Sequence, residues 1–411
     1  MDASRSKCFF VGRRGTGKTA ITYYLMNQAA DCVIQLLPQV FGLCSFLDCN
    51  DLLDTRQRPF HTLVHCFKRA LLDEVLGEWL GRGRVAVRSL PPALTRERNW
   101  FEDRDFDFRL LGLIESTFEL LKKSERDWLR EVGRDKEIAR AMEDLRGGPK
   151  WDYLIIIDRI DESWDGARSV VLLAALMHAC VELSAFTSFA RPLLFLRENV
   201  FDSVRSIDSE FTRLETCVVS VDWTDELLME MVERRLNAPF NTKLPLRGPT
   251  WDYFFEDGDF ARTSVLSYCQ QRPRDVLTYC SLAIEEAQSR AHERIQIDDL
   301  LNARLKFSES RLKDLGDEYS ENFPQIRVLL SKFYGLGREY TVGGVTSMVQ
   351  RLLVDEQIKE HCTKWFYNVS TPPLRHRVPR DKGRRKESIP FKRVPVLFSS
   401  SCNWLDDFGH P

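Results

Sequence analysis

A glycine-rich stretch near the start of the chain ends in a lysine and a threonine, in residues 12–19 with the sequence GRRGTGKT. The spacing GxxxxGK[ST] is typical of a loop whose backbone N–H groups surround phosphates, with the lysine on the β- and γ-phosphates and the hydroxyl on Mg²⁺. The stretch therefore predicts a nucleoside triphosphate site that takes ATP and Mg²⁺. The residues expected to bind this cofactor are Gly12, Arg13, Arg14, Gly15, Thr16, Gly17, Lys18, Thr19 and Ala20, with Thr19 also a metal ligand.

The residues on either side predict the elements that such a loop requires. Residues 8–11 (CFFV) are apolar and long enough for a buried parallel strand, and residues 19–26 carry apolar side chains on one face of a helix. A helix that begins at the loop favours anions through its dipole and its first N–H groups. A glycine-rich turn without a ligand is the alternative, and this strand–loop–helix context argues against it.

A second segment, 151–162 with the sequence WDYLIIIDRIDE, places carboxylates after a run of aliphatic residues. Such a run predicts a central parallel strand with Asp158 at its carboxyl end, where open α/β sheets bind ligands. We expect Asp158 to hold Mg²⁺ and either Asp161 or Glu162 to orient the attacking water. Buried strands that end in aspartate are common, so this segment alone is weak evidence for a metal site. The lysine-containing loop upstream is what supports that interpretation.

A third buried strand is predicted at 192–199, with the sequence PLLFLREN. Its polar end makes Arg197 and Asn199 candidates for sensing the γ-phosphate. A helix cap or a surface ion pair explains the same residues equally well. The helix predicted at 167–189 joins this strand to the previous one, so the two strands should be linked by a right-handed crossover.

Farther along, the stretch 271–277 (QRPRDVL) predicts the start of a helix that runs to about residue 292. Pro273 suits the first turn of a helix, and Arg272 and Arg274 flank it. A helix N-terminus gives cations no benefit, so an anionic partner is expected for these arginines.

The remaining patterns predict an α/β domain followed by helices. Further strands are expected at 33–37, 41–47 and 216–221, and further helices at 61–80, 106–145, 225–237, 260–268, 295–315 and 323–333. The helix at 106–145 should project from the sheet or cross it, and 82–100 and 238–258 should be loops. The predicted domains are an ATPase domain at 1–222, a helical lid at 223–305, a helical and incomplete winged-helix region at 306–370, and a tail at 371–411.

The composition is that of a globular protein, with 411 residues, 43% hydrophobic and 29% charged. No apolar run reaches the roughly 18 residues of a membrane span and the first residues lack a signal-peptide pattern, so a cytoplasmic location without membrane association is expected. The eleven cysteines are scattered without CxxC pairs and predict reduced core residues rather than a zinc site. Residues 371–411 carry nine Lys or Arg against four Asp or Glu among prolines and serines, which predicts a disordered tail.

The motifs together resemble the STAND and AAA+-like branch of P-loop ATPases, with a Walker A loop at Gly12–Thr19 and a Walker B strand that ends at Asp158. More narrowly, residues 8–335 resemble a bacterial family that carries GRRGTGKTA, IIIDRIDESW, FLRENVF and QRPRDVL. The resemblance implies a mainly parallel sheet flanked by helices, and a lid whose Arg274, or secondarily Arg272, contacts the nucleotide phosphates. Arg159 stands where typical AAA+ proteins have the catalytic glutamate, and a clear pattern is lost from Gly343 onward.

The leading functional hypothesis is an ATP-operated switch or assembly ATPase, with a role in bacterial genome or phage defence by family analogy. A DNA-binding initiator-type ATPase is the alternative. A P-loop kinase is favoured less, since it would need an acceptor site. The partners expected are the nucleotide and either a second copy of the chain or a protein effector, whereas the body of the chain has no basic character that indicates nucleic acid.

Overall fold

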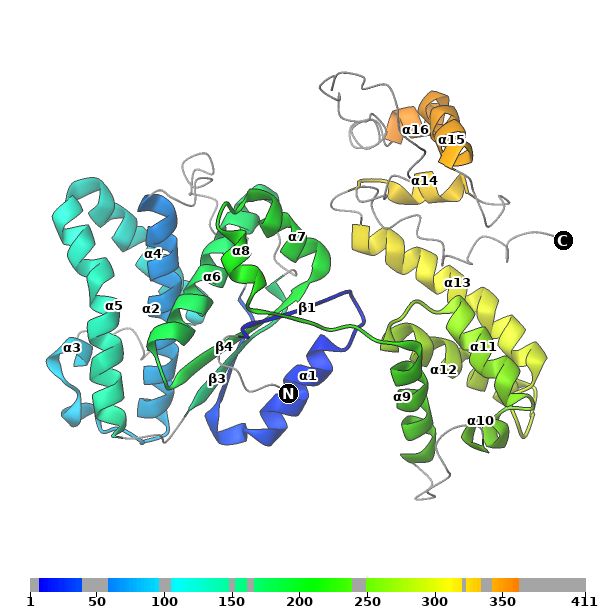
Figure 1. The fold of residues 1–411 in the computed structure, drawn as a ribbon, viewed down its shortest axis with the longest axis horizontal. Coiled ribbons are helices and arrows are strands. Elements are labelled where there is room, and N and C mark those ends of the chain that lie inside the picture. The colour runs from blue at the N-terminus through cyan, green and yellow to red at the C-terminus, as the bar shows by residue number, and fades with distance from the viewer. Residues whose placement is uncertain are drawn as a thin grey trace, which may run out of the picture. The chain divides into compact units, whose positions relative to one another are not determined.

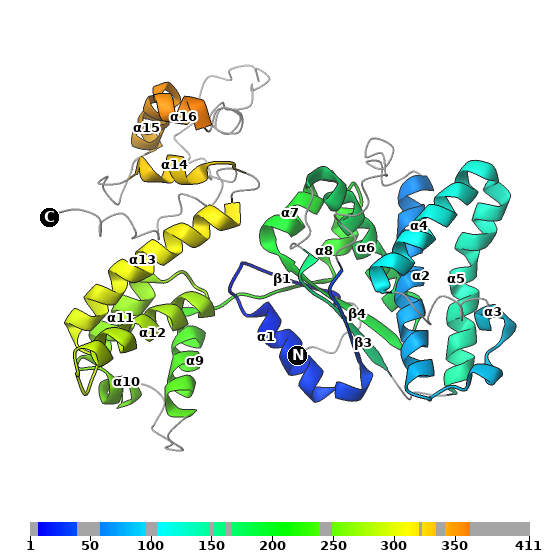
Figure 2. The same ribbon diagram turned by 180° about the vertical axis from the view of Figure 1, so that it is seen from behind.

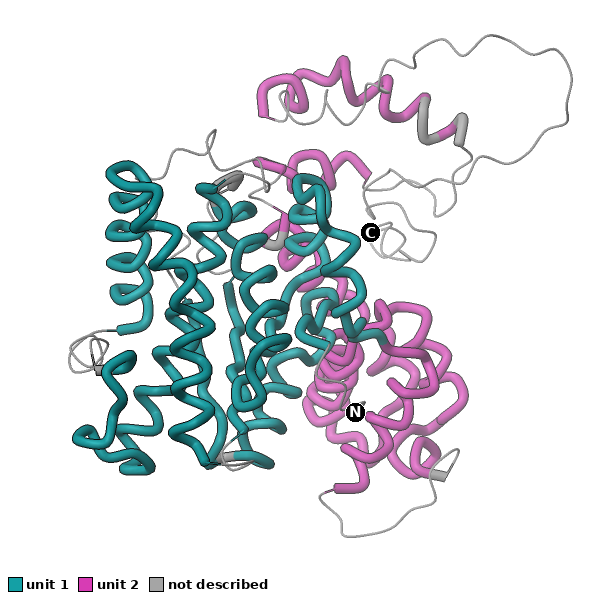
Figure 3. Tube along the Cα trace, turned by 60° about the vertical axis from the view of Figure 1, so that its left-hand side comes forward, with its two compact units in different colours: residues 1–222 teal, residues 223–411 magenta. Residues whose placement is uncertain are grey.

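The chain divides into two compact units, residues 1–222 and 223–411 (Figure 3). The computed structural model describes residues 7–38, 58–95, 105–147, 152–160, 166–238, 249–319, 323–333 and 342–361. The division falls between Asp222 and Trp223, at the position where the sequence pattern places the end of the first domain.

The first unit is an α/β structure around a parallel sheet of five strands in the order β2-β3-β4-β1-β5 (Figure 1). This agrees with the predicted fold class, a parallel sheet flanked by helices. The strands are β1 Phe9–Gly12, β2 Val33–Leu36, β3 Tyr153–Ile157, β4 Ala190–Arg197 and β5 Val218–Ser220. Residues 41–47, which were also predicted to form a strand, lie outside the described residues.

Strand β4 lies between β1 and β3 and links them in register. Leu194 of β4 pairs with Phe9 on one side and with Ile157 on the other. Farther along, Arg197 pairs with Gly12, the last residue of β1. Since all strands are parallel, the carboxyl ends of β1, β4 and β3 are neighbours at one edge of the sheet.

Alternate residues of the strands pack into two different layers. Phe10 and Phe195 stack at 4.9 Å between ring centroids on the face covered by α1 (Lys18–Gln28), which contributes Ile21 and Leu25. The opposite face carries a larger core with Phe9 and its neighbours. Helices α2 (Arg58–Gly81), α6 (Gly166–Phe186), α7 (Glu198–Ile207) and α8 (Phe211–Glu215) cover that face (Figure 2).

Two helices, α4 (Phe106–Lys123) and α5 (Glu125–Arg146), replace the single helix predicted at 106–145. The break falls at Ser124, whose backbone is extended and whose hydroxyl accepts the Asp127 N–H at 3.3 Å as the N-cap of α5. Both helices pack against α2, α4 through its buried apolar stripe. The prediction that this segment projects from the sheet or crosses it was therefore wrong.

The predicted loop at 82–100 also contains regular structure. A short 3₁₀ helix, η3, spans Val87–Ser89, and α3 spans Pro92–Thr95. Pro92 is the first residue of α3, a position at which a proline does not interrupt helix hydrogen bonds.

Helix α6 is the central core helix of the first unit. Its window Ser169–Phe186 is long and apolar enough to cross a membrane, with 18 residues and a mean hydropathy of 1.9, and 72% of it is buried inside the protein. The expectation that no segment is long and apolar enough for a membrane span was wrong. Polar residues such as His178 interrupt the apolar run, but the mean hydropathy of the 18 residues remains high. Its packing against α2 and β4 is that of a core helix.

The second unit is helical and has its own core. Its first helices are α9 Asp225–Asn237, α10 Pro249–Phe254, α11 Gly258–Tyr268, α12 Pro273–Ser289 and α13 Ile297–Tyr319. Trp251, Tyr279 and Phe307 lie in the core that these helices share. The Tyr279 hydroxyl donates to the Leu300 carbonyl at 3.0 Å, which joins α12 to α13. Helix α10 falls inside the segment predicted as a loop at 238–258.

A smaller core follows toward the end of the described chain. Helices α14 (Ile326–Ser331), α15 (Val342–Val354) and α16 (Glu356–His361) enclose it with side chains that include Leu329 and Leu352. The prediction that a pattern is lost from Gly343 onward was therefore wrong for residues 342–361. The winged-helix expectation stays a prediction, and the tail at 371–411 lies outside the described residues.

Candidate functional site

The loop between β1 and α1 is a tight turn that depends on its glycines. Gly12 is buried, and a Cβ atom there would lie 2.8 Å from Thr16 Oγ1 and 2.9 Å from the Val221 carbonyl oxygen. Gly17, the N-cap of α1, has a φ of +92°, which favours glycine. The close approach at Gly12 leaves no room for a side chain, so the sequence pattern and the backbone require the same residue.

Lys18 is the first residue of α1 and its ammonium lies against the loop. Lys18 Nζ donates to the carbonyl oxygens of Gly12 at 2.6 Å and of Arg13 at 3.0 Å. The Thr16 hydroxyl donates to the same Arg13 oxygen at 2.9 Å. The side chain therefore turns back over the glycine loop and places a positive charge beside its backbone.

The N-terminus of α1 supplies donors and a favourable dipole at the same place. At the start of α1, the Ile21 N–H donates to the Gly17 carbonyl at 3.1 Å. No side chain caps this end of the helix. The N–H groups at the start of a helix have no acceptor within it and favour an anion. Thr19 and Ala20 in this first turn are exposed, so the Thr19 hydroxyl is accessible to a metal ion.

Asp158 follows β3 and is buried, with 6% of its surface exposed. Its Oδ1 accepts the N–H of Arg159 at 2.9 Å. Arg159 has a φ of +60°, a left-handed conformation that is uncommon for arginine, and Ile160 then returns to the core. This turn orients the Asp158 carboxylate at the carboxyl end of the strand.

Arg197 is the last residue of β4 and the N-cap position of α7. Its register partner is Gly12, so the backbones of the glycine loop and of β4 are adjacent at this point. Asn199 was expected at the end of a strand, but α7 begins at Glu198 and Asn199 lies within that helix.

The structure thus brings three of the predicted segments to one edge of the sheet. Five cationic residues lie at or after the carboxyl ends of β1, β4 and β3, one of them at the start of α1, together with the acidic residues Asp158 and Glu198. The cations are Arg13, Arg14, Lys18, Arg159 and Arg197. Asp161 and Glu162 lie outside the described residues, so their role in orienting water stays a prediction.

Magnesium at this edge would require few protein ligands. In the described part of the chain, no group of three or more His, Cys, Asp or Glu residues could hold a metal ion. Mg²⁺ at nucleotide sites is usually bound through one or two protein groups, the substrate phosphates and water. Thr19 and Asp158 fit that smaller requirement by residue type and position.

Comparison with known proteins places the chain in a family. A protein of Alternaria alternata described as "Allergen Alt a 2" is 30% identical over 152 residues, which are 36% of this chain and 80% of that protein. The chain belongs to the family of Alt a 2. A "Putative transposon gamma-delta 80.3 kDa protein" of Escherichia coli (strain K12) is also 30% identical, over 194 residues, or 46% of this chain. The chain spans only 28% of the length of that transposon protein.

A family model also matches the second unit of this member of the Alt a 2 family. Residues 226–316 match the model described as the FunZ-associated C-terminal helical domain. The matched range includes α10, α11 and α12 together with most of α9 and α13. It therefore contains residues 226–305 of the predicted lid (223–305) and both of its arginines.

Arg272 and Arg274 differ in their surroundings within that helical domain. Arg272 is the N-cap residue of α12, and its side chain is 11% exposed. Its Nε and Nη2 lie 2.9 and 2.8 Å from Asp275 Oδ2. Asp275 is an anionic partner for Arg272, one of the two arginines for which such a partner was expected, whereas the Arg274 side chain, two residues away, is exposed.

Two features of these sites were not predicted. The pairing of Asp275 with Arg311 of α13, at 2.7 Å, joins residues 36 positions apart and leaves no local signal. The left-handed Arg159 carries no signal either, since glycine or asparagine is the usual residue there. The R-x-x-D spacing of Arg272 and Asp275 is a local signal, because side chains three apart on a helix are neighbours.

Proposed function

We propose that this chain is a P-loop ATPase that binds Mg·ATP at residues 12–19 and couples hydrolysis to a conformational switch or to assembly, as in STAND and AAA+-like proteins. The observation that carries the proposal is Lys18, whose ammonium lies over a glycine loop at the start of α1. A buried parallel strand leads into this loop, and such sites occur at the carboxyl ends of parallel strands.

In this proposal the nucleotide phosphates bind the first N–H groups of α1. Lys18 exchanges its two carbonyl acceptors for phosphate oxygens, which are stronger acceptors for an ammonium group. Thr19 and Asp158 would hold Mg²⁺, which neutralises charge on the phosphates. Arg197, whose backbone pairs with that of Gly12, would contact the γ-phosphate. Asp161 or Glu162 would orient the attacking water.

The test is a direct measurement of nucleotide binding and turnover by the full chain. We expect ATP to bind in a magnesium-dependent way and to be hydrolysed slowly. The mass of the protein in solution, measured with ADP and with a slowly hydrolysed ATP analogue, should then differ if assembly is the output. Absence of ATP binding at millimolar nucleotide would overturn the proposal.

A second candidate function is an ATPase that acts on DNA. The observation that favours it is the similarity to a protein named for a transposon, although only 28% of that protein is covered. DNA should then raise the ATPase rate. Phosphoryl transfer to an acceptor other than water would instead support the kinase hypothesis. For each of these activities we propose a cytoplasmic location, supported by the burial of α6 in a core.

A further inference from the structure

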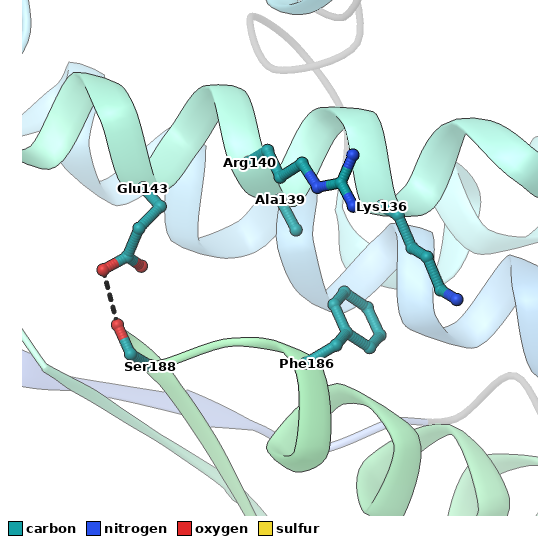
Figure 4. A pocket seen from close by; sticks show the side chains of 6 residues that line it. All are labelled: Lys136, Ala139, Arg140, Glu143, Phe186 and Ser188. Carbon is teal, nitrogen blue, oxygen red and sulfur yellow. Dashed lines mark hydrogen bonds between the residues drawn. The ribbon is translucent and has the colours of Figure 1, made fainter.

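The first unit contains a pocket far from the glycine loop. It lies between one face of α5 and the segment that joins α6 to β4 (Figure 4). Its volume is about 540 Å³, within the range of ligand sites. The lining residues are Lys136, Ala139, Arg140, Glu143, Phe186 and Ser188. Ser188 precedes β4, so the pocket is at the amino end of that strand, whereas Gly12 pairs with Arg197 at the carboxyl end, about 23 Å away along the strand.

The pocket combines an apolar floor with two cations. Phe186 at the end of α6 is half-buried, and Ala139 of α5 faces it (Figure 4). Lys136 and Arg140 are one helical turn apart on α5 and are both exposed. Within the described part of the chain, neither forms an ion pair or a side-chain hydrogen bond. They differ in this from Arg130 and Arg134 on the same helix, which pair with acids three residues earlier.

The one carboxylate in the pocket is already bonded. Glu143 accepts the Ser188 hydroxyl at 2.6 Å and lies 3.4 Å from Arg146 Nη1. This closes one end of the pocket and leaves Lys136 and Arg140 as the groups that lack a counter-charge. A ligand that fits must therefore carry a negative group next to a flat or branched apolar group.

The charged groups near the Phe186 ring are paired within the protein. The ammonium of Lys68 lies 5.9 Å from the Phe186 ring centroid and bonds Glu182 at 2.8 Å. Burial alone would lower the pKa of Lys68, but Asp135 and Glu182 together hold the pKa above its ordinary value. Lys68 therefore stays protonated, and its charge is compensated within the protein.

We propose that this pocket binds an acidic segment of a protein partner in which an aspartate or glutamate adjoins an aromatic or aliphatic residue. The carboxylate would contact Lys136 and Arg140, and the apolar side chain would cover Phe186. The lining follows about two turns of α5, which suits an extended peptide. Nucleic acid fits less well, because its backbone carries a negative charge at every phosphate and α5 has seven acidic residues against six basic ones, whereas the peptide has to place only one carboxylate at Lys136 and Arg140.

Selection of phage-displayed random dodecapeptides on the full chain tests this proposal. Enriched peptides should contain an acidic residue beside Phe, Leu or Trp, and should bind Arg140→Glu and Lys136→Glu about tenfold or more weakly than the unaltered protein. Both positions are exposed, so the melting temperatures should be unchanged. Arg126→Glu is the matched control, since this exposed arginine lies on the same helix about 21 Å from Arg140.

Three outcomes would overturn the proposal. The first is that no selected peptide distinguishes the unaltered protein from Arg140→Glu. The second is that Arg126→Glu weakens binding as much as Arg140→Glu, which would indicate general charge attraction. The third is that a labelled single-stranded oligonucleotide, and no peptide, loses affinity in Arg140→Glu, which would indicate nucleic acid. None of these measurements requires ATP, so their failure is separate from a failure of the proposed ATPase.

Discussion

Arg272 forms an ion pair with the buried Asp275 in the second unit, with Arg272 Nη2 2.8 Å from Asp275 Oδ2. Asp275 is 0% exposed, and its other oxygen accepts Arg311 Nη1 at 2.7 Å. Two guanidinium groups on different helices thus share one carboxylate, which fixes the start of α12 to α13. Arg272 is therefore engaged within the helical unit, while Arg274 is exposed beside it.

Alanine substitution of Arg272 and of Arg274 should have different effects, the first mainly on stability and the second mainly on nucleotide binding. Arg272→Ala should lower the free energy of unfolding by about 3 kcal/mol, because it removes one partner of a buried carboxylate. Arg274→Ala should change it by less than about 0.5 kcal/mol, since the side chain is exposed. Urea unfolding measures both. Under the proposed function, Arg274→Ala should also weaken ATP binding more than ADP binding; equal losses for the two nucleotides would contradict its role.

Lys18→Ala should abolish Mg·ATP binding without unfolding the protein, because the Lys18 ammonium lies against the glycine loop and outside the hydrophobic core. ATP should raise the melting temperature of the unaltered chain and leave that of Lys18→Ala unchanged. Lys122→Ala, at an exposed position on α4, is the control and should respond to ATP as the unaltered protein does. An equal ATP-dependent shift in Lys18→Ala would show that the site is elsewhere.

The carboxylates after β3 should divide into a metal ligand and a base. Asp158→Asn should lose turnover because it weakens the metal ligand. Glu162→Gln should bind ATP and retain it unhydrolysed, since it removes only the group that orients water. Single-turnover assays with labelled ATP distinguish binding from hydrolysis. Normal turnover in Glu162→Gln would transfer the role to Asp161.

Two glycine-to-alanine substitutions should have opposite effects on stability. Gly12→Ala places a Cβ 2.8 Å from Thr16 Oγ1 and 2.9 Å from a backbone oxygen, so we expect a loss of about 2 kcal/mol together with loss of ATP binding. Gly133→Ala, inside α5, meets nothing within 4 Å and should gain about 0.5–1 kcal/mol from helix propensity. Thermal unfolding checks both, and a stabilised Gly12→Ala protein would contradict the close approach seen in the loop.

Deletion of residues 372–411 should leave nucleotide binding and the melting temperature nearly unchanged. The prediction comes from composition, since prolines oppose helix and sheet in this basic segment. Any DNA affinity that the deletion removes should be weak, independent of sequence and lost by about 0.2 M salt. A large fall in melting temperature would instead show that residues 391–404 pack against the rest of the protein.

Local sequence patterns were sufficient to predict the strands, loop and helix that carry the candidate site. The apolar run of β1, the glycine loop and the spacing in α1 are all within 20 residues, and Asp158 directly follows its strand. The break between α4 and α5 was missed, although Ser124 and Asp127 have the S-x-x-D spacing of a helix start. The break lies in a highly charged segment, and apolar residues recur at helical spacing both before and after it. The periodicity alone therefore indicated one helix.

Contacts between segments that are far apart in the chain could not be predicted from local sequence patterns. Short buried strands are apolar on both faces and contain no information on which neighbour they pair with, so the order β2-β3-β4-β1-β5 could not be predicted. The same holds for the contact of Arg311 with Asp275 and for the pocket between α5 and the end of α6. Each joins segments that meet only when the chain has folded.

The pairing of β1 has a consequence for biosynthesis. In the part of the sheet that the structure describes, Phe9 pairs with Leu194 of β4 and Val218 of β5, so these partners of the strand that leads into the glycine loop are made late in synthesis. During this interval α2, α4 and α5 can pack together, because their contacts are more local. The apolar residues 8–11 meanwhile remain an unpaired strand, which is the kind of segment that chaperones protect. Strand β1 is therefore expected to be among the last elements of the first unit to join the sheet.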